Sequence, residues 1–207
     1  MRFKNFLALT LTFAAVGTAC TDTTTQPILE PHGNKVQSND LLGGLLGGLT
    51  SLLIPPLKRT TPLAQDVVWS FTAGPAGATS TNSALGIKIV IPAYALSTTQ
   101  TITVTALKGY PVAYGFSPHL VFSKKVYLTQ NLNGTNAGLL GSLLISGAHF
   151  DGDRLDLTSD GLAIVDEVVP AILNLSLLTR SATFGVDHFS GWVVASGKAI
   201  SSDGGSY

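Results

Sequence analysis

The sequence contains little of what many enzymes and nucleic-acid-binding proteins depend on. Its 207 residues include one cysteine, one methionine and four histidines, and only 12% of them are charged. A single cysteine excludes an internal disulfide and a cysteine-based metal cluster. The formal net charge is zero, so no excess of basic residues is present to bind phosphates, and we expect no nucleic-acid partner. No phosphate loop or nucleophile elbow stands out, so we expect neither a cofactor nor an enzyme with turnover.

Long hydrophobic runs are also missing. The apolar stretch Phe6 to Val16 is too short to span a bilayer, and Arg2 and Lys4 precede it, which is the layout of a secretory signal. Small residues then lead to Cys20, an arrangement similar to that of bacterial lipoproteins, in which the cysteine is lipidated and becomes the new N-terminus. We therefore expect a signal peptide over residues 1–19 and a membrane anchor through lipid on Cys20. Ordinary cleavage, which leaves a soluble exported protein, is the alternative.

Residues 20–63 lack the alternating pattern of strands. Thr21 to Asp40 is polar, and we interpret it as a tether; a threonine rather than an aspartate after the cysteine favours the outer membrane of a bacterial envelope, by analogy with enteric bacteria. Leucines from Leu41 to Leu53 recur at helical spacing with glycines on the opposite face, and Pro55 ends the pattern. A related stretch runs from Gly138 to Gly147. Three roles stay open for the Leu/Gly-rich segment: local packing, contact with a membrane surface, and self-association.

Residues 64–200 show a period of two. Short runs rich in Val, Ile, Thr and aromatic residues are separated by Gly, Pro, Asn and Ser. From Thr101 to Ala106, threonine and apolar residues alternate strictly. Seven or eight such strands without strong helices between them predict an all-β fold, an antiparallel, immunoglobulin-like β-sandwich. Residues 201–207 are expected to form a polar tail.

Two segments carry a family resemblance. Ile91 to Leu96 reads IPAYAL at the end of a strand, and Phe116 to Phe122 reads FSPHLVF before the next one. This order resembles the ZU-five domain, the β-sandwich of ankyrins and netrin receptors, relatives of which occur in bacterial surface proteins and lipoproteins. The resemblance covers about Ser83 to Gln130. It implies a ZU-five-like sandwich, and because the matching residues are apolar or turn-forming, it indicates a fold rather than a function.

Half of the acidic residues gather between Asp151 and Glu167. Asp151, Asp153 and Asp156 could bind Ca²⁺ through their carboxylates, but their spacing is not that of a calcium loop. The pairs Asp-Gly at residues 151–152 and 160–161 are hairpin-turn signals, and we favour turns here. The lone histidines His119 and His149 are expected to be structural, because nothing supplies the ligand spacing that zinc needs.

The stretch His188-Phe189-Ser190 admits two interpretations. In two eukaryotic members of the resembling family, the same three residues at the start of a late strand mark where the chain cuts itself. The resemblance thus implies that Ser190 attacks the carbonyl carbon of Phe189 while His188 takes the hydroxyl proton. The other interpretation is the entry to a strand, with Phe189 packed inward. We favour the strand entry and expect an intact chain.

Together these features predict a non-enzymatic envelope lipoprotein with a structural or binding β-sandwich. Its expected partners are the membrane, through the lipid on Cys20, and an envelope protein or glycan. The alternatives are a self-processing domain that cleaves at Phe189-Ser190, and an adhesin that depends on carbohydrate or calcium.

Overall fold

The computed structural model describes residues 51–137, 144–176 and 180–201, which belong to one compact unit. These residues form fourteen strands and almost no helix. The strands are β1 (Leu52–Ile54), β2 (Lys58–Leu63), β3 (Val67–Ala73), β4 (Ala78–Asn82), β5 (Ile87–Ile91), β6 (Gln100–Ala106), β7 (Gly109–Pro111), β8 (Ala113–Asn131), β9 (Ile145–Phe150), β10 (Ala163–Val165), β11 (Glu167–Pro170), β12 (Ile172–Leu175), β13 (Arg180–Ser196) and β14 (Ile200–Ser201).

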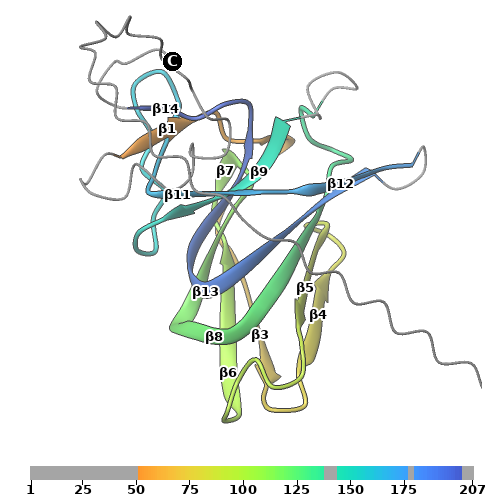
Figure 1. The fold of residues 1–207 in the computed structure, drawn as a ribbon. Coiled ribbons are helices and arrows are strands. Elements are labelled where there is room, and N and C mark those ends of the chain that lie inside the picture. Colours follow the sequence, from red (N-terminus) through yellow and green to blue (C-terminus); the bar gives the residue numbers. More distant parts are fainter. Residues whose placement is uncertain (1–50, 138–143, 177–179, 202–207) are drawn as a thin grey trace, which may run out of the picture. The chain divides into compact units, whose positions relative to one another are not determined.

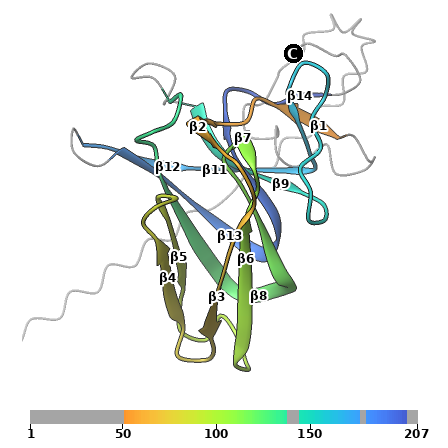
Figure 2. The ribbon, with the colours of Figure 1, turned by 180° about the vertical axis from the view of Figure 1, so that it is seen from behind.

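All strand pairs are antiparallel. The main sheet has the order β11-β9-β13-β8-β5-β4; in addition, β12 pairs with β13, β6 pairs with β8, and β3 pairs with β6. Two small sheets, β10-β1-β14 and β2-β7, complete the described part of the chain, and Figures 1 and 2 show the arrangement from opposite sides. The predicted all-β, sandwich-like fold is confirmed.

The two longest strands, β8 and β13, change partners along their length. Residues Thr103–Ala106 of β6 pair with the first part of β8, whereas β5 pairs with residues 127–130 of β8. Similarly, β12 pairs with the start of β13 and β9 with its end. Figure 1 shows β8 and β13 bending together at one corner. Because each strand continues through the bend, the sheet folds back on itself and encloses a core.

The core consists of the side chains that alternate inward along these strands. Ile102, Val104 and Ala106 are fully buried, as their alternation with threonine predicts. Phe189 is buried as well; its ring stacks on Phe116 at 4.2 Å between centroids and meets Phe122 edge to face at 4.7 Å. Burying one large apolar side chain contributes about 1.5–3 kcal/mol, so this aromatic group fixes the corner of β13.

The predicted domain boundary at residue 64 is wrong. Leu52–Ile54 forms β1, between β10 and β14, and β2 follows at Lys58–Leu63, while Ile54 and Leu57 are fully buried. The end of the predicted leucine helix is therefore a strand, because pairing with two neighbours outweighs a local helical spacing that several glycines already weaken. Leu41 to Thr50, like all residues before them, lie outside the described residues. Of the predicted polar tail, only Ser201 is described, and it is part of β14.

Strand β9 was not predicted. The sequence from Gly138 to Gly147 resembles the earlier Leu/Gly-rich segment, yet residues from Ile145 onward form a strand between β11 and β13. A Cβ atom at Gly147 would overlap the ring of Phe184, and one at Gly191 would overlap the ring of Phe150. Glycine is therefore required where β9 and β13 pack against these rings.

Candidate functional site

The His188-Phe189-Ser190 stretch lies where the ladder between β13 and β8 is interrupted. Phe189 faces Leu120, but Gly191 faces Gly115, so four residues of β8 lie opposite Ser190. The ladder between β13 and β9 starts only at Gly191, which faces Phe150. Ser190 thus has no register partner in either described neighbour, and its backbone escapes the full restraint of a regular ladder.

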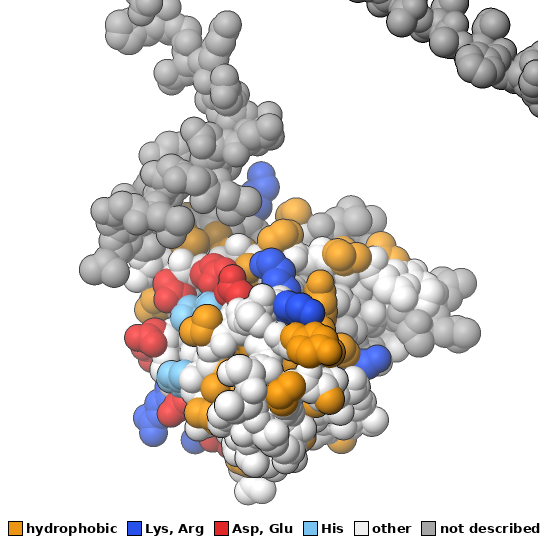
Figure 3. Space-filling model, turned by 60° about the horizontal axis from the view of Figure 1, so that its bottom comes forward, with side chains coloured by type: hydrophobic (Ala, Val, Ile, Leu, Met, Phe, Trp, Pro, Cys, Tyr) orange, Lys and Arg blue, Asp and Glu red, His pale blue; other side chains and the backbone are white. Residues whose placement is uncertain are grey.

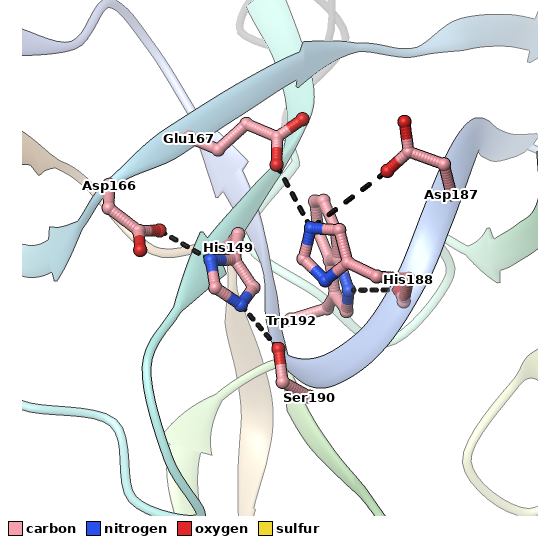
Figure 4. A network of polar contacts seen from close by, with 7 residues as sticks. All are labelled: His149, Asp166, Glu167, Asp187, His188, Ser190 and Trp192. Atoms are coloured by element: carbon pink, nitrogen blue, oxygen red, sulfur yellow. Dashed lines mark hydrogen bonds and ion pairs between the residues drawn. The ribbon is translucent and has the colours of Figure 1, made fainter. Parts of the chain in front are cut away.

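The side chain of Ser190 ends a chain of hydrogen bonds. Its hydroxyl contacts Nε2 of His149, and Nδ1 of the same imidazole lies 2.5 Å from Oδ1 of Asp166. An ionised carboxylate only accepts, so Nδ1 carries the proton and donates it, which leaves Nε2 to accept from the serine hydroxyl. Figure 4 shows the three side chains in line, from strands β9 and β13 and from the residue before β11.

Burial differs along this chain of hydrogen bonds. Ser190 is 7% exposed, the side chain of His149 is 12% exposed, and the carboxylate-bearing side chain of Asp166 is 57% exposed. The hydroxyl is therefore shielded, whereas the acid end meets water. A serine, a histidine and an acid in this order are the parts of an activated nucleophile: the imidazole removes the hydroxyl proton, and the acid holds the imidazole in the required tautomer.

His188 has a different partner from the one that the sequence hypothesis gave it. Its Nε2 lies 3.2 Å from Oε2 of Glu167 and 4.0 Å from Oδ1 of Asp187, while its backbone carbonyl accepts a bond from Nε1 of Trp192 at 3.2 Å. The hydroxyl of Ser190 is bonded to His149 instead. The assignment of His188 as the base is therefore wrong, because the serine hydroxyl is already bonded to an imidazole from the neighbouring strand β9.

The aspartates considered for calcium do not converge. Gly152 and Gly161 have φ values of 80° and 77°, which fits the predicted turns. Asp153 instead lies 3.9 Å from His119, and both side chains are largely exposed. In the described part of the chain, the one group of three potential metal ligands is His149, Glu167 and His188, which includes neither Asp151, Asp153 nor Asp156. Cys20, the predicted lipidation site, lies outside the described residues.

The groove that the described residues form over β6 lies away from the serine. A groove of about 880 Å³ lies over β6, the start of β8 and the loop after β9, and its lining includes Thr105, Gly115 and Arg154 but not Ser190, His149 or Asp166. This groove therefore does not bring an external substrate to the hydroxyl.

Sequence reasoning missed His149 and Asp166. The only signal is that the dipeptide His-Phe occurs twice, at residues 149–150 and 188–189, each time next to an aspartate. What brings these segments together is the pairing of β9 with both β11 and β13, in which His149 faces Glu167 on one side and Trp192 on the other. That register depends on the fold and could not be derived from local spacing.

Comparison with known proteins gives no family assignment. No protein-family model matches the chain, and no curated protein matches it. The ZU-five resemblance therefore stays a prediction.

Proposed function

We propose that this chain is a β-sandwich module that cuts its own backbone once, between Phe189 and Ser190. The observation that carries the proposal is the hydrogen-bond chain Asp166–His149–Ser190, which ends on the hydroxyl directly after the carbonyl of Phe189. This is the self-processing alternative of the sequence analysis, with His149 in place of His188 as the base.

The position of the hydroxyl favours its own chain as the target. The carbonyl carbon of Phe189 is bonded to the nitrogen of Ser190, so attack on it closes a five-membered ring, whereas attack on the carbonyl carbon of Ser190 itself would close a strained four-membered one. Such an intramolecular attack needs no binding step, and well-oriented groups reach effective concentrations far above those in solution. Because Ser190 is buried and does not line the groove over β6, a separate substrate is disfavoured.

The chemistry balances without a cofactor. Nε2 of His149 takes the proton of Ser190 Oγ, and the oxygen attacks the carbonyl carbon of Phe189. The C–N bond then breaks, the imidazolium returns the proton to the leaving nitrogen of Ser190, and an ester joins Phe189 to Oγ. Water, which reaches the site through the exposed side of Asp166, hydrolyses the ester and leaves a carboxylate on Phe189 and a free amine and hydroxyl on Ser190.

The residues on either side hold the scissile bond in place. The ring of Phe189 lies between Phe116 and Phe122. On the other side, Gly191 pairs with Gly115 and Phe150 in two ladders. Ser190, between these two anchored residues, lacks a register partner in both ladders, so the ladders restrain its backbone less than that of its neighbours.

The products are expected to stay together. Residues 191–196 pair with β9, those from Gly191 to Val193 also pair with β8, and the side chains from Trp192 to Ala195 are buried. The cut would therefore leave a folded sandwich with a nick, and a native preparation would hide it. Such a single event is compatible with the anchored binding or structural role that the sequence predicts.

Export and anchoring rest on the sequence alone. The proposed module would be attached to a bacterial envelope membrane through lipid on Cys20, with the outer membrane as the expected location. Among the described residues, no helix has the length and hydrophobicity that crossing a membrane requires. The substitution Cys20→Ser should move the protein out of the membrane fraction, and fractionation of cells that express each form measures the change. Wild-type protein that is already soluble after export would contradict the anchor.

The test of cleavage is the intact mass of freshly purified full-length protein under denaturing conditions. Cleavage produces a C-terminal fragment of about 18 residues that starts at Ser190 and ends at Tyr207. Ser190→Ala should abolish the fragment, whereas Ser146→Ala, at another buried serine of the same sheet, should leave it unchanged. Intact wild-type protein after prolonged incubation, or a fragment that persists in Ser190→Ala, would contradict the proposal.

A further inference from the structure

A second polar cluster adjoins the serine. His149, Glu167 and His188 lie so that one ligand atom from each is within 4.8 Å of the other two. The imidazoles of the two histidines are 4.5 Å apart between centroids, and Nε2 of His188 lies 3.2 Å from the carboxylate of Glu167. These residues come from β9, β11 and β13, so three strands contribute to one point on the sheet (Figure 4).

We propose that His149, Glu167 and His188 bind a divalent transition metal ion, with zinc as the best match. Two imidazoles and one carboxylate form a donor set that suits zinc, which binds nitrogen at about 2.0–2.1 Å and leaves a fourth position open when three protein ligands are present. Calcium is disfavoured because it takes six to eight oxygen ligands.

The three ligands are held by the sheet before a metal arrives. His149 and Glu167 are direct register partners in the β9–β11 ladder, and His149 faces Trp192 in the β9–β13 ladder. The buried indole of Trp192 lies 5.4 Å from the ring of His149 and 5.3 Å from that of His188, and it bonds to the backbone of His188. Ligands on paired strands are positioned more accurately than ligands on loops.

The charge around the cluster favours a cation. The carboxylate of Asp187 lies 4.0 Å from Nε2 of His188, and that of Asp166 is bonded to His149. Asp187 can supply a further oxygen ligand, and Asp166 can orient the imidazole as an outer partner. Figure 3 shows histidine side chains beside acidic ones on one face of the molecule, and the side chains of Glu167 and Asp187 are 43% and 59% exposed.

Metal binding and activation of Ser190 exclude each other. Both ring nitrogens of His149 are already occupied, Nδ1 by Asp166 and Nε2 by Ser190. A metal on either nitrogen breaks one of these two bonds, so it removes either the base or the group that orients the base. This consequence rests on the proposed self-cleavage: zinc would keep the chain uncut until the ion is removed. The binding itself does not depend on that proposal.

The experiment measures Zn²⁺ binding to full-length, tag-free Ser190→Ala protein, which cannot be cut, after treatment with a chelator. Calorimetry should show one ion per chain, and Co²⁺ should give the absorption of a tetrahedral site. Glu167→Gln and His188→Ala should each weaken binding at least tenfold. His119→Ala, which removes the exposed pair of His119 with Asp153, should leave the affinity unchanged. Absence of saturable binding would overturn the metal site, and so would an affinity that neither Glu167→Gln nor His188→Ala changes.

A second measurement separates the metal site from its regulatory consequence. Wild-type protein is incubated with Zn²⁺ or with chelator, and the C-terminal fragment is quantified. The proposal expects at least tenfold less fragment with Zn²⁺ at saturation. Equal cleavage under both conditions would show that zinc binding and activation of Ser190 do not exclude each other. If the wild type never cuts, self-cleavage fails, whereas the titration of the Ser190→Ala protein still decides whether the ion binds.

Discussion

Two polar groups that reach into the core of this sandwich differ in what their protons can do. One joins Asp166, His149 and Ser190 at the corner of β13. The other lies elsewhere along β8, where the hydroxyl of Tyr114 donates to Oε1 of Gln130 at 2.6 Å with the guanidinium of Arg59 close by. In both groups a buried hydroxyl has a hydrogen-bond partner, without which its burial costs about 1–3 kcal/mol.

In the group around Tyr114, the charges of the side chains are fixed near neutral pH. Burial raises the pKa of Tyr114 to about 12, against the opposing effect of the Arg59 cation, and burial also lowers the pKa of Arg59. Neither side chain changes its charge near neutral pH. The amide of Gln130 in turn donates to the carbonyls of Leu85 and Asn131, at 3.0 and 2.9 Å. These contacts make the second group a structural element.

The group around Ser190 places an imidazole where it can accept a proton from a hydroxyl. Imidazole accepts and releases a proton under physiological conditions, and here it joins a hydroxyl to a carboxylate. The groups around Tyr114 and Ser190 both contain buried polar atoms, so burial alone does not mark a reactive site in this protein. The distinguishing features are an imidazole between acid and nucleophile, and a gap in the backbone ladder at the nucleophile.

The largest expected effect separates the two histidines at the corner. His149→Ala should slow cleavage about 100- to 10,000-fold, because it removes the general base. His188→Ala should leave cleavage within a few-fold of wild type in metal-free buffer, since this imidazole pairs with Glu167. Denaturing mass spectrometry over time gives both rates. Equal losses in the two variants would remove the special role of His149.

Phe189→Ala tests how firmly the core holds the corner. The substitution should reduce the free energy of unfolding by roughly 3–5 kcal/mol, because it leaves a cavity between Phe116 and Phe122. The measurement is urea unfolding in the Ser190→Ala background, where the chain stays intact. Tyr127→Ala, at a half-exposed aromatic residue of β8, should cost clearly less. A similar cost in both variants would mean that Phe189 does not anchor the bend.

Alkaline pH should affect the structural group. The folded-state pKa of Tyr114, at about 12, lies above the ordinary value of 10.0, so the folded chain retains the proton longer than the unfolded chain. Its contribution is fully present below pH 10 and is lost as the pH rises toward 12, by about 2–3 kcal/mol in total. Unfolding curves from pH 9 to 12 measure the loss. Tyr114→Phe should lack this part of the decline; an unchanged decline would show that Tyr114 is not its source.

Removal of one hydroxyl should have the smallest effect. Tyr114→Phe leaves Oε1 of Gln130 without its donor and should cost roughly 1–2 kcal/mol at neutral pH. Tyr110→Phe, at an exposed tyrosine of the same chain, should change stability by a few tenths at most. Chemical denaturation of both variants in the Ser190→Ala background makes the comparison. Equal stability of the two would mean that water replaces the lost donor.

Local pattern determined the parts of the fold that follow from alternation. Ile102, Val104 and Ala106 alternate with threonines, so their burial in β6 could be predicted, and Phe189 was expected to point inward. Ile91 to Leu96 was placed at the end of a strand, and β5 does end at Ile91, directly before Pro92. These features depend on side-chain period and on the missing donor of proline, which the sequence contains directly.

Only the tertiary structure decided which residues meet. His149 lies 41 positions before Ser190, and Asp166 lies 17 positions after His149. Their proximity depends on the registers of β9 with β11 and β13, and a shift of one residue would turn each side chain to the other face. Long-range pairing also decides strand β1. Leu52 and Leu53 belong to the helically spaced leucines, yet β1 pairs with β10 and β14. Composition and period thus determined an all-β chain, whereas long-range backbone pairing determined which histidine reaches the serine.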